Sequence, residues 1–267
     1  FKQKTAYEIR LSLVGSEMCI RDSLCRTQGG CSMKPLISVI IPTYQHADSL
    51  PACLESVFAQ AYQPIEVIVV DDGSTDNTQE VLADYQDRIV SIKQANAGSN
   101  PARNRGLKEA KGEYVIFCDA DVTMSPKMLE TMFNALEQHP YASYAYSGFW
   151  FGWKHFKGVA FSADELKRLN FVHTSSLVRK ADFPGFDEQI RRLQDWDVWL
   201  TMLEHGKVGV LVPETLFSVG IDGASRIGSS WLPAFVYRLP WSRLGWKPRR
   251  VQKYEDARKI ILQKHKL

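Results

Sequence analysis

Long apolar runs are missing from this chain of 267 residues. No uninterrupted apolar stretch approaches the roughly 20 residues that a transmembrane helix requires, so we expect a soluble or peripheral protein. Internal repeats and low-complexity tracts are missing as well, which argues against a repeat architecture. The hydrophobic fraction of 45% and the charged fraction of 24% are ordinary for a folded protein and are sufficient for one large domain. The formal net charge is only +3, and no nucleic-acid partner is expected.

Cysteine is scarce and irregularly placed. Three of the five cysteines, Cys19, Cys25 and Cys31, lie in the first 32 residues, and Cys53 and Cys118 stand alone. This arrangement is not a disulfide framework, and its spacing matches none of the short cysteine pairs typical of zinc sites. We therefore expect reduced thiols and a cytoplasmic location.

The first 32 residues lack the features of a structured or targeting segment. They show no sustained periodicity, and the apolar residues 11–14 are too few for the central region of a signal peptide. Residues 2–10 and 15–22 instead resemble a conceptual translation of sequencing-adaptor DNA. We expect residues 1–32 to be a disordered, non-native leader and Met33 to be the native start.

From Leu36 onward, short β-rich runs alternate with amphipathic segments of helical length. This alternation predicts an α/β fold with a mostly parallel sheet and helices on both faces. Residues 65–70 are apolar without alternation, which favours a strand buried on both faces. Further strands are expected at residues 36–41, 89–93, 114–118, 143–153 and 171–178, and helices at residues 48–60, 74–85, 102–110, 126–137 and 194–205.

Carboxylates directly follow two of these strands. Asp71 and Asp72 come after the strand at 65–70, and Asp119 and Asp121 come at the end of the strand at 114–118. In open α/β sheets, ligands bind outside the carboxyl ends of the strands, so the four acids predict one polar crevice. A nucleoside diphosphate held by a divalent cation would fit there, because Mg²⁺ and Mn²⁺ favour oxygen ligands. The alternative is that the acids only cap turns and helices.

Five motifs follow one another at compatible spacing between about residue 37 and residue 225. They are Pro42-Thr43-Tyr44, the segment 70–76, Asn96-Ala97-Gly98 with Ala102-Arg103-Asn104, Asp119-Ala120-Asp121, and Phe186-Asp187-Glu188 followed by the segment 194–200. Each is weak alone, but together they resemble glycosyltransferase family 2, the inverting nucleotide-sugar transferases of GT-A fold. The resemblance implies a Rossmann-like GT-A domain at residues 33–225.

The resemblance also implies roles for individual residues. It assigns Asp121 to a divalent cation, Mn²⁺ or Mg²⁺, and Asp119 to the donor ribose or the same cation. Asp72 would accept a hydrogen bond from a uracil-type base. The other residues implied on the donor side are Pro42 and Tyr44 at the edge of the nucleotide pocket and Arg103 at the nucleotide or phosphate. For Arg103, a solvated basic face is the alternative.

Asp195 is the expected catalytic base. Transfer to a hydroxyl needs a base within hydrogen-bond reach of the acceptor proton, and a carboxylate can serve. The family's base is the second member of a Glu-Asp pair, which corresponds to Gln194-Asp195, so the chain departs from the family at Gln194. Asp197 competes for the role, yet residues two apart on a helix do not share a face. The alternative for Asp195 is a helix cap. His173 is expected to be structural, and a place lining the acceptor site is its alternative.

The implied activity is transfer of a sugar, with inversion, from a nucleoside diphosphate donor to an acceptor hydroxyl in cell-envelope polysaccharide or glycolipid synthesis. UDP-sugars are the favoured donors, and a glycan or lipid-linked molecule is the expected acceptor. A nucleotidyltransferase is one alternative, but it needs a phosphate-cradling glycine-rich loop near its first strand, which residues 42–45 do not form. A non-catalytic nucleotide-sugar binding module is another, because Gln194 and Asp222 depart from the family pattern.

Residues 226–267 are expected to form an aromatic and basic appendage that ends in a polar helix. Interfacial aromatic residues beside basic ones indicate contact with an anionic surface, such as the inner face of a membrane. A tail packed back over the acceptor cleft is the alternative. The residues concerned are Trp231, Phe235, Tyr237, Trp241, Trp246, Lys247, Arg249, Arg250, Lys253, Arg258, Lys259, Lys264 and Lys266.

Overall fold

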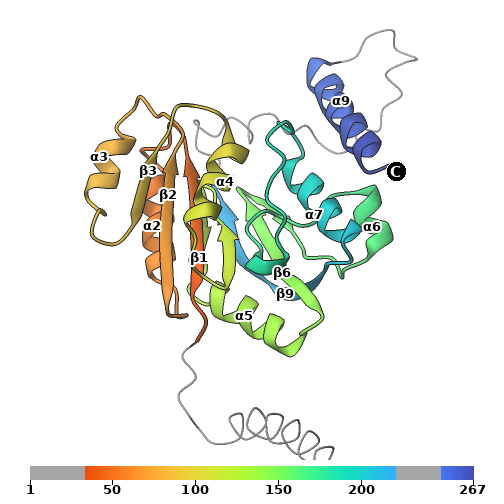
Figure 1. The fold of residues 1–267 in the computed structure, drawn as a ribbon, viewed down its shortest axis with the longest axis horizontal. Coiled ribbons are helices and arrows are strands. Elements are labelled where there is room, and N and C mark those ends of the chain that lie inside the picture. The colour runs from red at the N-terminus through yellow and green to blue at the C-terminus, as the bar shows by residue number, and fades with distance from the viewer. Residues whose placement is uncertain (1–33, 221–247) are drawn as a thin grey trace, which may run out of the picture. The chain divides into compact units, whose positions relative to one another are not determined.

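The structure, a computed structural model, describes residues 34–220 and 248–267. Within these residues, nine strands form one sheet in the order β3-β2-β1-β4-β8-β6-β9-β5, and β7 pairs with β6 (Figure 1). The strands are β1 (Ile37–Thr43), β2 (Ile65–Asp71), β3 (Val90–Lys93), β4 (Tyr114–Phe117), β5 (Val122–Met124), β6 (Ala142–Phe151), β7 (Lys154–Phe156), β8 (Leu177–Arg179) and β9 (Val208–Val219). Strands β1 to β4, β6 and β9 run in one direction, and β5, β7 and β8 oppose them. The predicted α/β class with a mostly parallel sheet is confirmed.

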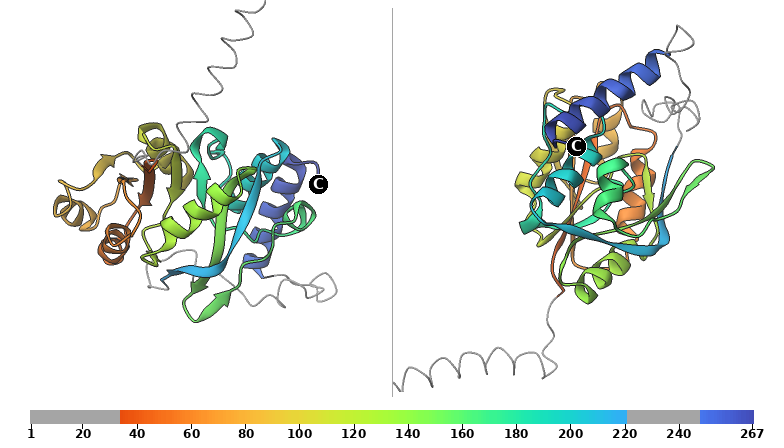
Figure 2. Two further views of the ribbon diagram at one scale, coloured as in Figure 1. Left: turned by 90° about the horizontal axis from the view of Figure 1, so that it is seen from below. Right: turned by 90° about the vertical axis from the view of Figure 1, so that its right-hand side faces the viewer.

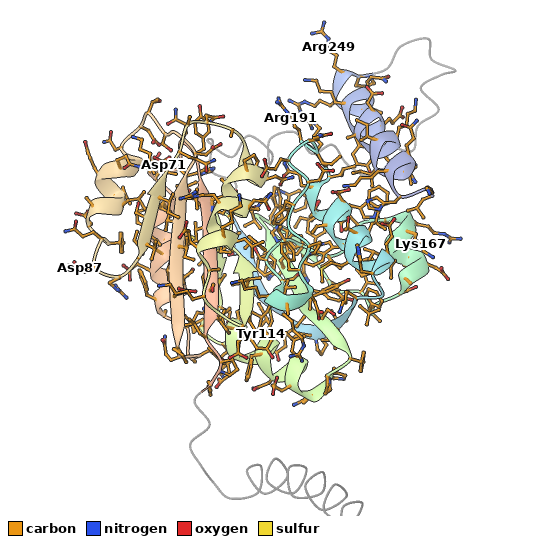
Figure 3. All side chains as sticks on the ribbon, viewed as in Figure 1. Asp71, Asp87, Tyr114, Lys167, Arg191 and Arg249 are labelled. Atoms are coloured by element: carbon orange, nitrogen blue, oxygen red, sulfur yellow. The ribbon has the colours of Figure 1, made fainter. Side chains whose placement is uncertain are left out.

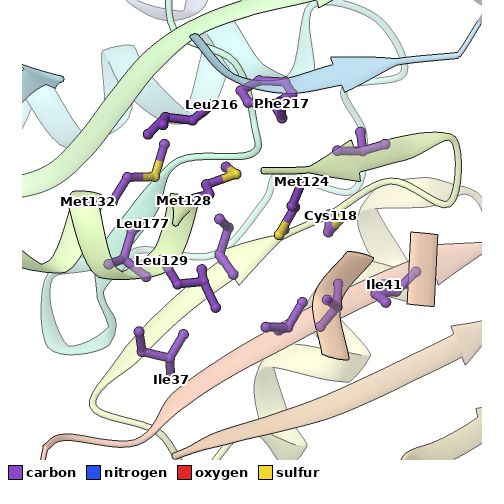
Figure 4. Close-up of a cluster of buried hydrophobic side chains, with 14 of the residues drawn as sticks. Ile37, Ile41, Cys118, Met124, Met128, Leu129, Met132, Leu177, Leu216 and Phe217 are labelled. Carbon is purple, nitrogen blue, oxygen red and sulfur yellow. The ribbon is translucent and has the colours of Figure 1, made fainter. Parts of the chain in front are cut away.

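Helices lie on both faces of this sheet (Figure 2). The first core packs β1, β2 and β4 against α2 and α5, and Figure 4 shows part of it, in which Ile37 and Ile41 of β1 belong to the same cluster as Met124, Met128 and Phe217. The second core packs the opposite face of the same strands against α4, α6 and α7. The helices are α2 (Leu50–Phe58), α3 (Thr78–Ala83), α4 (Ser99–Glu109), α5 (Met128–Gln138), α6 (Ala163–Arg168), α7 (Gln194–Glu204) and α9 (Arg249–Lys264), with a 3-10 turn η1 (Lys180–Asp182).

The central strands have the burial that their sequence predicts. Val67, Ile68, Val69 and Val70 of β2 are all 3% exposed or less, and they alternate between the two cores. A glycine lets α4 approach the sheet closely, because a Cβ added at Gly106 would lie only 2.4 Å from Ile40 Cγ2.

Strand β1 extends beyond the predicted end, through Pro42 to Thr43. Its pairing with β4 ends at Ile40 opposite Phe117, whereas its pairing with β2 continues to Thr43 opposite Asp71. Pro42 therefore lies where β1 has a neighbour on one side only, a position at which the missing N–H of proline is tolerated.

The second half of the sheet differs more from the prediction. The strand expected at 171–178 is wrong for most of its length, because β8 covers only Leu177–Arg179. The preceding residues form a loop held by hydrogen bonds from Ser175 N to His173 Nδ1 and from Ser176 Oγ to His173 O. Elements β5, β7, α6 and the long strand β9 were not anticipated, whereas α9 confirms the helical tail.

Several expectations fall outside the described residues. The leader 1–32 with Met33 and its three cysteines, Asp222, and residues 226–247 of the appendage lie there. Within the described part of the chain, no helix combines the length and apolar character needed to cross a bilayer. Cys53 and Cys118 are buried free thiols whose sulfur atoms lie 3.6 Å apart.

Candidate functional site

The acids that follow the strands gather at one edge of the sheet. Strands β1, β2 and β4 are parallel, so their carboxyl ends lie side by side. Figure 3 places Asp71, at the end of β2, on the edge opposite to Tyr114, with which β4 begins. Asp72 continues the alignment, because its main-chain N donates to Thr43 O at 2.9 Å. The acids therefore share one edge of the sheet, and the polar crevice expected between them stays a prediction.

Asp72 holds the loop that leads into α4. Its side chain is buried, and it accepts hydrogen bonds from Gln94 Nε2 at 2.8 Å, Ala97 N at 2.8 Å and Gly98 N at 2.7 Å. Two of these donors share Oδ1, whereas among the described residues Oδ2 accepts from Gly98 alone. Since a carboxylate oxygen can accept two hydrogen bonds, Oδ2 retains capacity for a further donor. A base-reading role for Asp72 stays a prediction.

The expected pocket edge lies beside Asp72 at the end of β1. Pro42 is buried within the strand, and Tyr44 is half-buried just after it. Gln45, which the sequence did not single out, adopts φ 58° and binds the neighbouring loop, since its side chain donates to Thr75 Oγ1 and accepts from the main-chain N of Thr75 and Asp76. The contacts of Gln45 thus fix the loop that carries Tyr44 against the loop that follows Asp72.

Arg103 is a buried cation on α4, so the alternative of a solvated basic face is wrong. It is 5% exposed, and its Nη2 lies 2.7 Å from Asp119 Oδ1. Its Nη1 contacts Asn100 Oδ1 and Gln194 Oε1, each at 3.3 Å. Burial acts to raise the pKa of Asp119, but the charge and hydrogen bond of Arg103, assisted by His173, hold that pKa below its usual value. Arg103 therefore keeps Asp119 ionised at the edge of the sheet.

Asp119 and Asp121 flank the buried residue Ala120 in the turn between β4 and β5. The turn is fixed by hydrogen bonds from Val122 N to Asp119 O at 2.9 Å and from Gly220 N to Asp121 O at 2.8 Å. Among the described residues, no group of three or more His, Cys, Asp or Glu side chains is arranged to hold a metal ion. Two carboxylates still fit a hard cation that takes its other ligands from substrate phosphates and water.

Asp195 lies in the first turn of α7, after Leu193 in the left-handed conformation. Its Oδ1 accepts from the main-chain N of Trp196 at 2.9 Å, and its Oδ2 accepts from Asn170 Nδ2 at 2.6 Å. Burial raises the pKa of Asp195, although His173, the two donors and Arg103 act against it. Asp197, two residues on, faces different partners, because its buried carboxylate contacts Lys264 and His265.

His173 interacts electrostatically with both Asp119 and Asp195. Burial lowers its pKa, Asp119 and Asp195 act to raise it, and Arg103 acts to lower it. Its Nδ1 accepts from Ser175 N at 3.0 Å, so a neutral ring carries its proton on Nε2. The ring packs 4.9 Å from the Phe149 ring and 5.0 Å from the Phe217 ring.

Gln194 links the two helices that carry site residues. Its Oε1 accepts from Ser99 Oγ at 3.2 Å and from Arg103 on α4, and its Nε2 donates to Ile190 O at 3.3 Å. The structure thus brings together Asp119, Arg103, His173 and Asp195. Sequence reasoning missed Asn170 and gave a place for His173 in the site only as an alternative; the signal for both was the segment 170–176, in which most residues are polar.

Comparisons with known proteins agree with this geometry. Residues 38–182 match the family model described as glycosyl transferase family 2. The uncharacterized glycosyltransferase YibD of Escherichia coli is 44% identical over 105 residues, which cover 38% of this chain and only 30% of YibD. Staphylococcus aureus TarS 1-349 in complex with UDP-GlcNAc is similar in structure, with a TM-score of 0.63 at 21% identity over 73% of this chain and 61% of TarS 1-349. The mannosyltransferase PcManGT of Pyrobaculum calidifontis, in complex with GDP-Man and Mn²⁺, gives a TM-score of 0.56 at 20% identity over 86% of this chain and 70% of PcManGT. These similarities identify the fold as GT-A.

Proposed function

The chain belongs to glycosyl transferase family 2, and from this premise we propose that it is a glycosyltransferase that transfers a sugar from a nucleoside diphosphate donor to an acceptor hydroxyl with inversion. The observation that carries the proposal is a pair of acids whose pKa values are shifted in opposite directions. Arg103 holds Asp119 ionised, whereas burial raises the pKa of Asp195. Gln194, the neighbour of Asp195, contacts Arg103 and so links the two acids. TarS 1-349 binds UDP-GlcNAc and PcManGT binds GDP-Man, which supports a nucleotide-sugar donor. Asp72, as the acceptor for a uracil-type base, favours a UDP-sugar.

Asp195 is the proposed catalytic base. A carboxylate whose pKa is raised by burial is a stronger base than one in water, and it can take the acceptor proton as the hydroxyl attacks the anomeric carbon. Asn170 and the Trp196 amide hold both carboxylate oxygens and fix their direction. Attack from the face opposite to the leaving group inverts the anomeric configuration. Pro42, Tyr44 and Asp72 would border the donor base.

Asp121 and Asp119 would hold a divalent cation, Mn²⁺ or Mg²⁺. When bound, the cation would stabilise the negative charge that develops on the departing diphosphate. Arg103 neutralises part of the charge of Asp119 through Oδ1 and keeps that carboxylate deprotonated.

The acceptor is proposed to be a glycan or a lipid-linked molecule of the cell envelope, used at the inner face of the membrane. Exposed basic residues of α9 and the exposed Trp153 between β6 and β7 support contact with an anionic lipid surface. The basic residues are Arg249, Arg250, Lys253 and Lys259.

The test is nucleoside diphosphate release by the full chain with UDP-, GDP- and dTDP-sugars, in Mn²⁺ or Mg²⁺ and with EDTA as the control. We expect release from one donor, loss of release in EDTA, and a product of inverted configuration. Asp195→Asn should lower kcat by at least about a hundredfold, because a positioned base contributes roughly 10²–10⁴-fold, while nucleotide binding persists. Asp84→Asn on the exposed end of α3 is the matched control. Undiminished turnover in Asp195→Asn contradicts the assignment, and donor binding without release from any sugar favours a binding module.

A further inference from the structure

The end of α9 is bound to α7 by a cluster of charged side chains. Asp197, whose side chain is 3% exposed, lies 2.8 Å from Lys264 Nζ and 2.9 Å from His265 Nε2. The other ring nitrogen of His265 lies 2.8 Å from Glu204 Oε1. Lys264 and His265 at the end of α9 thus meet two carboxylates of α7.

Lys264 also contacts the segment that precedes α7. Its Nζ lies 2.8 Å from Asp187 Oδ2, and this hydrogen bond contributes most to lowering the pKa of Asp187. The main-chain carbonyl of Asp187 accepts from Asn100 Nδ2 at 2.7 Å. Because Asn100 lies on α4 and itself contacts Arg103, Lys264 is linked to both helices that carry site residues.

Asp195 and Asp197 share the first turn of α7, and the residue between them is also held by α9. Trp196 donates through its indole Nε1 to Leu166 O at 2.6 Å, and the Arg258 guanidinium carbon lies 6.0 Å from the centre of its ring. The main-chain N of Trp196 donates to Asp195. A buried carboxylate that loses its paired lysine is strongly destabilised, so loss of the α9 contacts would loosen the turn that orients Asp195.

We propose that Lys264 and His265 are positioning residues for Asp195, so that α9 completes the transferase site from outside the residues matched by the family model. Val251 and Ile261 of α9 are fully buried, which shows that the helix packs closely enough to serve this purpose. The inference rests on the proposed function, because it takes Asp195 as the base.

The test uses the full chain with three substitutions at these positions and one control. Lys264→Met removes a contact to Asp197, and His265→Gln removes the ring that bridges Asp197 and Glu204. Lys264→Arg restores the charge, and Gln263→Met alters an exposed residue on the same helix. We expect kcat to fall about tenfold in the first two variants while KM for the donor stays within about twofold, since small displacements of a reacting group cost large factors in rate. Lys264→Arg should recover most of kcat. Amide hydrogen exchange over residues 194–200 should become faster in the first two variants and stay unchanged in the control.

Each outcome of this experiment decides the proposal. Unchanged exchange over residues 194–200 in both variants overturns it whatever the turnover, and faster exchange with unchanged kcat overturns the positioning role. If His265→Gln does not fold, Lys264→Met decides, because the lysine side chain is 33% exposed and its loss is better tolerated. Failure of the proposed function is recognised separately, as donor binding without turnover in the wild type, and the exchange result then still decides whether α9 fixes α7.

Discussion

Replacement of Arg103 by methionine tests the ion pair between Arg103 and Asp119. The substitution keeps much of the side-chain volume but leaves Asp119 without its cation at 2.7 Å and removes the two 3.3 Å contacts to Asn100 and Gln194. Breaking a buried ion pair on one side costs about 3–5 kcal/mol. The Asp119 side chain is 32% exposed, so water compensates part of this loss. We expect a loss of about 2–3 kcal/mol in the free energy of unfolding at pH 7.

The pH dependence of that loss has a defined sign. The pKa of Asp119 is lower in the folded protein than in the unfolded chain, so its pairing stabilises the fold above the unfolded pKa and loses its effect as pH falls through the folded pKa. In Arg103→Met, burial raises the pKa of Asp119 instead. The difference between wild type and variant should therefore be largest at neutral pH and should shrink below about pH 4.

Urea unfolding at a series of pH values measures this difference. With a slope of about 2–3 kcal/mol/M, the midpoint of the variant should fall by about 1 M at pH 7. Arg105→Met is the matched control, because Arg105 lies on the same helix with a side chain 51% exposed and pairs with Glu109 at 3.3 Å, and we expect it to cost no more than about 0.5 kcal/mol. Equal costs for the two substitutions, or a cost at Arg103 that does not shrink on acidification, would refute the reasoning.

Two further predictions concern the base and the packing of α4. Asn170→Ala removes a hydrogen bond that lowers the pKa of Asp195. On the acidic side of the pH profile, kcat rises with pH as the proposed base ionises, and this rise should move to higher pH in the variant. A rise that stays at the same pH contradicts the role of Asn170. Gly106→Ala should destabilise the protein by about 1–3 kcal/mol in thermal or urea unfolding, because the added Cβ would lie 2.4 Å from Ile40 Cγ2 and this overpacking outweighs the usual gain in helix propensity. Lys108→Ala on the exposed face of α4 is the control, and equal stability of the two variants argues against the packing account.

The first half of the fold follows closely from the sequence because local signals there agree with the tertiary context. Strands β1, β2 and β4 are largely buried on both faces, so their residues are mostly apolar, and acids follow β2 and β4. The second half was harder to predict. Strand β9 mixes exposed and buried residues, and the segment 170–176 forms hydrogen bonds through the side chains of Asn170, His173 and Ser176 instead of a strand ladder.

The candidate site divides in the same way. The positions of Asp72, Asp119 and Asp195 could be predicted because strand ends and a helix start determine them. The burial of Arg103 and its ion pair with Asp119 could not be predicted, because the two residues belong to different elements and no local pattern shows that they meet. The contacts of Asp197 with Lys264 and His265 join residues more than 60 positions apart, so no local pattern predicts them.

The two acids near His173 acquire opposite properties from their surroundings, and this opposition is the strongest physical argument for chemistry at the site. Asp119 lies beside a buried guanidinium, which holds its pKa down and suits it to contact a cation or a ribose in a permanently ionised form. Within the described part of the chain, Asp195 accepts hydrogen bonds from two neutral donors, and burial raises its pKa, which suits it to accept a proton and release it again. Acids that only cap turns have no reason to have their pKa values shifted in opposite directions. A base that activates an acceptor and an acid that binds a donor require such opposite shifts.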